Sequence, residues 1–199
     1  MNNNEYEKVK SLTYLEYCDY LQKKYGIGNC DYFTENWSKK PKVTRTKEGL
    51  FAHHKYEDHA ILLGEVEHAK KNPYEWQRAE NIVYCDWLEH LLLHILICEY
   101  PSKDKNVFED VGVGGATSYI IPELNDLYSG MDITLPWKQN CFDIIKNDVE
   151  TYVKLVKRVM KSCKKCPTYD ENQVFGSLNE KLGTWSSKNN EKLYKMFKN

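Results

Sequence analysis

The sequence has no apolar run long enough to cross a membrane. Its longest apolar stretch, from Leu91 to Cys98, is interrupted by His94, whereas a membrane-spanning helix needs roughly 20 apolar residues. The first seven residues, Met1 to Glu7, lack the apolar core of a secretory signal. We therefore expect a soluble, cytoplasmic protein with no membrane partner.

Glycine, proline and paired cysteines are also scarce. The 10 glycines and 6 prolines exclude a fibrous repeat. The seven cysteines form no dense disulfide framework, so reduced thiols are expected. Cys163 and Cys166 make a single CxxC pair, and no second pair stands at the spacing of a zinc site. We interpret them as free thiols.

Neither sign of charge dominates the whole chain, whose formal net charge is −1. Residues 146–199, however, hold 12 Lys and Arg against 6 Asp and Glu, which leaves the rest of the chain acidic. A basic C-terminal region of this kind could bind phosphates, or it could be a solvated helix surface. The charge alone favours the second interpretation.

Hydrophobic residues make up 41% of the chain, enough for the core of a single domain over residues 1–199. The spacing from Thr13 to Glu16 is that of a capping box and predicts a helix to Tyr25. Apolar periodicity predicts further helices at 58–71, 86–100, 142–160 and 191–197, short strands at 49–56 and 81–84, and a glycine-containing loop at 101–118. The expected fold is α+β and mainly helical, with a basic helical C-terminal region over residues 141–199.

Four of the six histidines form a pattern with one asparagine. His53 and His54 are adjacent at the end of an expected strand, and Asn81 opens the next one. His90 and His94 follow Asn81 by nine and thirteen residues. As residues i and i+4 they share one face of a helix, so both imidazoles can reach one ion. With one histidine from the strand they could hold a transition metal and leave positions open for substrate and water.

Adjacent strand residues point to opposite faces, so at a strand end one of the two neighbouring histidines can bind the ion while the other addresses a water molecule beside it. The second histidine would act as a general base if another group fixed its orientation and tautomer. An asparagine amide on the facing strand can do this without adding charge. Either histidine pair alone is more often structural, so the interpretation depends on the joint pattern.

The order and spacing of these residues resemble the HNH, or ββα-metal, nucleases, and are closest to the colicin-type DNase variant, whose ion is held by three histidines. The segment from Glu80 to His94 carries most of the likeness, and Leu50 to His54 supplies the rest. The resemblance covers residues 45–98, roughly a quarter of the chain. It implies a small ββα-metal core around which the other helices wrap.

Applied residue by residue, the resemblance implies that His53, His90 and His94 are ligands of one divalent ion, which could be Mg, Mn, Ni or Zn. It implies that His54 is the general base, and that Asn81 pins the loop between the two strands and orients His54. His59 and His68 match no position of the pattern. Glu57 and Asp58 could support the ligands, but surface charge is their default interpretation.

The chain departs from the resemblance in two places. Asn81 follows His54 by 27 residues, more than the compact loop common in the family, so residues 57–80 are expected to form a helical insertion. Many relatives carry two cysteine pairs that bind a structural zinc, but no CxxC pair flanks the histidine strand here. We expect no such zinc.

The resemblance implies a metal-dependent endonuclease that hydrolyses phosphodiester bonds in DNA, as restriction, phage or mobile-element enzymes do. RNA is a second possible substrate. A non-catalytic binding or interaction protein on a ββα scaffold is the alternative from another functional class. Basic residues in two segments are expected to contact nucleic acid phosphates: Lys42, Arg45, Lys47, Lys157, Arg158 and Lys161.

Overall fold

The structure is a computed structural model that describes residues 1–180 and 185–199. Its strands are β1 (Phe51–His54) and β2 (Ile82–Cys85). The α-helices in this part of the chain are α1 (Asn3–Val9), α2 (Tyr14–Tyr25), α3 (Val66–Ala69), α4 (Trp87–Glu99), α5 (Ile121–Tyr128), α6 (Pro136–Asp143), α7 (Val149–Ser162), α8 (Glu171–Val174) and α9 (Glu191–Lys198). Shorter helical segments are the 3-10 turns Pro41–Val43, Thr46–Glu48, Tyr74–Gln77, Ala79–Asn81, Cys163–Lys165 and Ser187–Asn190, and the π-helix Gly115–Ile120. The expected mainly helical α+β fold is confirmed.

The two strands form an antiparallel hairpin that leads directly into α4. Phe51 pairs with Cys85, and His54 pairs with Ile82. Asp86 then begins the helix through a capping box, because its side chain accepts from the Glu89 amide while the Glu89 carboxylate accepts from the Asp86 amide. The cap fixes the direction of α4 relative to β2. This strand–strand–helix unit has the order that the resemblance implies.

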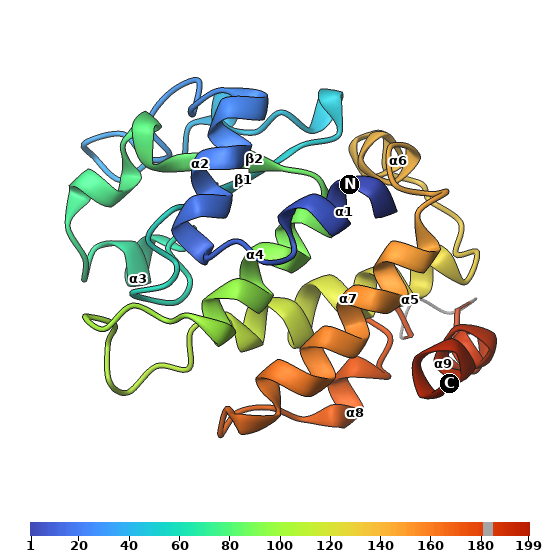
Figure 1. Ribbon diagram of the computed structural model, residues 1–199. Coiled ribbons are helices and arrows are strands. Elements are labelled where there is room, and N and C mark those ends of the chain that lie inside the picture. The colour runs from blue at the N-terminus through green and yellow to red at the C-terminus, as the bar shows by residue number, and fades with distance from the viewer. Residues whose placement is uncertain (181–184) are drawn as a thin grey trace.

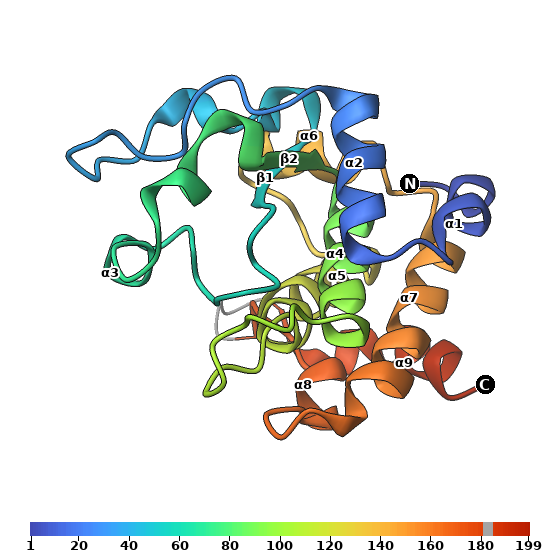
Figure 2. The ribbon, with the colours of Figure 1, turned by 60° about the vertical axis from the view of Figure 1, so that its left-hand side comes forward.

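Helix α4 is the centre of the hydrophobic core. All of its residues except His90 and Glu99 are buried, as its nearly unbroken apolar sequence predicts. Helices α2 and α7 and the π-helix pack against it, and in Figure 1 α7 runs alongside α4 whereas α2 lies at an angle to it. In Figure 2 the hairpin lies in the upper part of the molecule, whereas α8 and α9 lie at its lower end.

No helix among the described residues is long and apolar enough to span a membrane. The seven cysteines, all of which lie in the described part of the chain, are free thiols.

The segment 57–80 is not the expected helical insertion. It consists mainly of turns, with only the four-residue α3 and two 3-10 turns. Besides the hydrogen bonds of its own turns, the segment bonds the distant loop 101–110: the His59 carbonyl accepts from the Asn106 amide, and the Ile61 amide donates to the Glu109 carboxylate. The His59 ring also lies between the Asp58 carboxylate and the Ser102 hydroxyl, at 2.7 and 3.0 Å.

Two further expectations were wrong in detail. The glycine-containing segment does not remain a loop to residue 118, because the π-helix begins at Gly115 and continues directly into α5. The expected helix 142–160 is divided, since α6 ends at Asp143 and α7 begins at Val149. The Tyr128 hydroxyl donates to the carbonyl of Ile145 in the turn between them. The other expected helices and both strands are present with small shifts of their ends.

A buried carboxylate in α5 holds the C-terminal segment against the core. Asp126 is fully buried and accepts hydrogen bonds from backbone and side-chain donors at Ser177, Leu178, Asn179, Trp185 and Asn190. A buried carboxyl group is tolerated when donors surround it in this way.

We predict that Asp126→Ala lowers the free energy of unfolding by at least about 3 kcal/mol, because it leaves several buried donors without an acceptor. Urea denaturation followed by tryptophan fluorescence measures the change. Asp132→Ala is the matched control: Asp132 is exposed, so its loss should change stability by less than about 0.5 kcal/mol. Equal stability of the two variants would contradict the role of Asp126.

Candidate metal centre

The structure brings His53, His90 and His94 together. His53 lies near the end of β1, and the other two lie one turn apart on α4. Each offers one ring nitrogen, and these three nitrogens all lie within 4.8 Å of one another. The hairpin register and the helical spacing therefore place the three histidines as the sequence predicts.

Two of the ring nitrogens are spaced as ligands of one ion would be. The Nε2 atoms of His90 and His94 are 3.2 Å apart, close to the separation of about 3.3 Å expected for two nitrogens bound tetrahedrally to one zinc ion. His53 Nε2 lies 3.0 Å from the Tyr14 hydroxyl, whereas its Nδ1 is buried and has no hydrogen-bond partner. Buried polar atoms without a partner are rare in proteins. The residues therefore fit a bound metal ion.

Burial keeps all three imidazoles neutral. Desolvation lowers the pKa of His53 to about 3, although Glu57 acts in the opposite direction. It likewise lowers the pKa values of His90 and His94 below the ordinary value of histidine. Neutral imidazoles have a free lone pair, which is the form that binds a metal.

Glu57 adds a carboxylate to the three histidines. Its Oε2 lies 3.5 Å from His53 Nδ1 and 3.7 Å from His94 Nε2, and its Oε1 lies 3.6 Å from His54 Nδ1. Burial alone would raise the pKa of Glu57, but the nearby histidines, His53 above all, outweigh this effect and lower it. Its default interpretation as surface charge was wrong: only 18% of the side chain is exposed.

His54 points to the other face of β1, where Gln77 and not Asn81 fixes its ring. His54 Nε2 lies 2.9 Å from Gln77 Oε1; because an amide oxygen only accepts, Nε2 carries the proton and Nδ1 has the lone pair. The Asn81 amide donates instead to the Glu75 carbonyl at 2.7 Å. Asn81 thus holds the loop before β2 but does not orient His54, since it lies in a 3-10 turn that precedes the strand.

The glycines of the segment 112–115 allow close approach to His94. A Cβ atom on Gly115 would lie 2.2 Å from a carbon of the His94 ring, and one on Gly112 would lie 2.7 Å from the His94 carbonyl oxygen. Gly112 also has a φ of +85°, which favours glycine. This part of the glycine-containing segment, which the sequence predicts as a loop, is therefore packed directly on a histidine of the centre.

A cavity of about 540 Å³ lies beside the histidines. Its walls include Glu57, His90 and His94, parts of the segments 61–65 and 108–120, and Thr168. Buried His53 and His54 do not line it. A molecule in this cavity would contact the helix α4 side of the centre.

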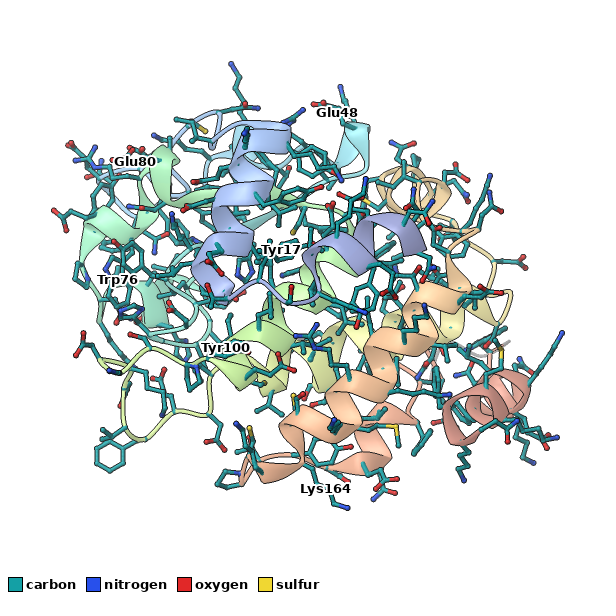
Figure 3. The ribbon with its side chains drawn as sticks, viewed as in Figure 1. Tyr17, Glu48, Trp76, Glu80, Tyr100 and Lys164 are labelled. Atoms are coloured by element: carbon teal, nitrogen blue, oxygen red, sulfur yellow. The ribbon has the colours of Figure 1, made fainter. Side chains whose placement is uncertain are left out.

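The basic residues expected to bind nucleic acid lie away from this cavity, and two of them have partners. Arg45 donates to Glu48 and to the Tyr25 carbonyl, and Arg158 donates to Glu99 and to the Lys10 carbonyl. The remaining residues of this set are exposed: Lys42, Lys47, Lys157 and Lys161. Figure 3 shows the two segments at opposite ends of the molecule, marked by Glu48 and Lys164.

No protein-family model, curated protein or solved structure matches the chain. The resemblance to the HNH nucleases therefore stays a prediction.

Three contributors to the centre were missed or undervalued from the sequence: Tyr14, Glu57 and Gln77. For Glu57 a signal exists, because it follows His53 and His54 by four and three residues, within one turn of the strand end.

We predict that His90→Ala and His94→Ala each sharply lower the content of divalent transition metal in the purified protein, because each removes one nitrogen ligand. Elemental analysis after dialysis measures the content. His68→Ala is the control, since His68 lies in α3 and does not line the cavity. Unchanged metal content in the His90→Ala/His94→Ala double variant would refute the assignment.

We also predict that Gly115→Ala weakens metal binding by roughly 10- to 100-fold, the range seen when groups that orient a ligand are changed, because the added methyl displaces the His94 ring. Gly114→Ala is a matched control: a Cβ at Gly114 meets nothing within 4 Å, and the residue has helical dihedral angles. Titration with a divalent ion by calorimetry distinguishes the two. Equal affinities would show that Gly115 does not position His94.

Proposed function

We propose that this protein is a metal-dependent endonuclease of the ββα-metal type, which hydrolyses phosphodiester bonds in nucleic acid, with DNA as the expected substrate. The observation that supports this most is the convergence of His53, His90 and His94 from a β-hairpin and the helix that follows it. The neutral imidazoles and the anionic Glu57 make a donor set suited to a dication.

The donor set favours a transition metal over magnesium, because imidazole nitrogen suits Zn, Ni and similar ions whereas Mg prefers oxygen. A bound divalent ion would supply stabilisation of the negative charge that develops on the phosphate oxygens during hydrolysis. Tyr14 contributes by holding His53 Nε2, which leaves Nδ1 directed to the centre.

The protein's own contribution to proton transfer comes from His54 and Glu57. Gln77 holds the His54 tautomer in which Nδ1 can accept a proton, and the Gln77 amide is itself fixed by a 3.4 Å hydrogen bond to the Leu63 carbonyl. An imidazolium formed on accepting the proton would lie beside the Glu57 carboxylate, which stabilises it. Glu57 faces the cavity and His54 does not, so Glu57 would take the proton of the attacking water and pass it to His54 Nδ1.

Contacts with the nucleic acid backbone are assigned to the exposed lysines Lys42, Lys47, Lys157 and Lys161. The ion pair of Arg158 with Glu99 is partly buried, so Arg158 and Arg45 would contribute less. Because the two segments lie at opposite ends of the molecule, they would not form one continuous phosphate-binding surface.

We predict that His54→Ala reduces the cleavage rate by roughly 100- to 10,000-fold, the usual loss for a general base, while metal content stays at the parental level. The assay is cleavage of supercoiled plasmid and, separately, of total RNA with Mg, Mn, Ni or Zn and with chelator. His68→Ala should cut like the parent.

Glu57→Gln should reduce both metal affinity and the cleavage rate, because the Glu57 carboxylate lies 3.5 to 3.7 Å from ring nitrogens of His53, His54 and His94.

Cleavage of RNA alone would assign the enzyme to RNA. If the parent protein cleaves neither substrate with any of the four ions, the proposal is wrong and a non-catalytic binding protein on this scaffold is favoured. Parental activity in His54→Ala would refute its role as the base.

A further inference from the structure

The cavity beside the histidine centre has an unusual charge distribution. Apart from the histidines and Tyr119, the ionisable residues in its walls are all carboxylic: Glu57, Glu65, Glu109 and Asp110. Neither lysine nor arginine is among its lining residues. Lys105, in the same loop as Glu109, donates to the backbone oxygens of Asn106 and Glu109. A run of phosphates would be repelled from such walls.

The rim of the same cavity is apolar and aromatic. Phe108 is 95% exposed and Tyr119 is 60% exposed. Leu62, also on the rim, is exposed and has a φ of +56°, a conformation that costs a branched residue energy and recurs at ligand sites. Exposed apolar side chains gathered at a cavity with a polar surround mark binding sites.

The two aromatic residues are carried by ordered structure. The Phe108 amide donates to the Asn106 side chain, whose amide group donates to Glu109, and Glu109 in turn accepts from the Ile61 amide. Tyr119 lies in the π-helix, a rare form that occurs frequently at functional sites. The start of that π-helix is packed on His94 through Gly115. The rim and the histidine centre are thus parts of one site.

We propose that this cavity binds an unstacked nucleobase whose phosphodiester lies at the histidine centre, with the base stacked on Phe108 or Tyr119. The inference rests on the proposed function and narrows its substrate to nucleic acid with an unpaired nucleotide. Every base has an aromatic face that can stack on such rings, and a base is uncharged, so acidic walls do not oppose it. The phosphate, in contrast, is excluded from the cavity and remains at the centre.

The unpaired base could belong to a single strand, to a nucleotide extruded from a duplex, or to a dinucleotide. Binding is measured with 2-aminopurine, a fluorescent base that is quenched on stacking, placed in a single-stranded 12-mer, in a bulged duplex, in a fully paired duplex and in a dinucleotide. The full-length His54→Ala protein with Zn is the background, so that binding is read without cleavage.

Phe108→Ala and Tyr119→Ala are each made in this background, and at least one should weaken binding of the unpaired probes by roughly 5- to 150-fold and reduce the quenching. Phe108→Trp should retain both. Tyr100→Ala is the matched control, because Tyr100 is 52% exposed but lines a different pocket. Circular dichroism confirms that each variant is folded. The relative affinities of the three unpaired probes identify the source of the base.

Tight binding of the fully paired duplex with no preference for unpaired probes would overturn the proposal, as would unchanged affinity and quenching in the double variant Phe108→Ala/Tyr119→Ala. These outcomes are separate from the test of cleavage. If probes bind through the aromatic residues but the parent protein cuts nothing, the cavity assignment stands and the nuclease proposal fails. If the double variant cuts paired DNA like the parent, the nuclease proposal stands and the cavity assignment fails.

Discussion

The burial of helix α4 on all of its faces is the constraint on which the rest of the structure depends. An apolar helix of this kind must be covered, and α2, α7 and the π-helix do so. The same cover desolvates the imidazoles that α4 carries, and desolvation disfavours their charged form. The packing that stabilises the core therefore also prepares neutral nitrogen ligands at its edge.

Short-range rules explain why part of the centre could be predicted from the sequence. His90 and His94 are brought together by helical spacing alone, and the Asp86–Glu89 capping box places the start of their helix. His53 joins them because a hairpin returns β1 beside β2, immediately before α4. Gln77 could not be placed, because residues 57–80 are expected from the sequence to form a helical insertion. Hydrogen bonds to residues 102–109, more than 40 positions away, favour turns instead.

Charge in the sequence likewise gives only a partial account of the surface. Arg45 pairs with Glu48, three residues away, a partner that local spacing allows. Arg158 pairs with Glu99, which is remote in sequence and reaches it only because α4 and α7 pack together. A count of basic residues over 146–199 therefore overstates the cations available to a ligand, whereas the acidic character of the cavity arises from segments that are distant in sequence.

In the proposed enzyme, the centre and the cavity would divide the recognition of a substrate between charge and shape. Three neutral imidazoles and one carboxylate give the centre a net negative charge, and the cavity adds three further carboxylates: Glu65, Glu109 and Asp110. Without a cation, this arrangement repels a phosphate by Coulomb's law, and a dication at the centre would reverse the local sign. Stacking of a base on the aromatic residues of the rim would not depend on charge. In the proposed enzyme, affinity for the phosphate would therefore depend on the ion, whereas selection of the attached group would depend on the fold of residues 108–120.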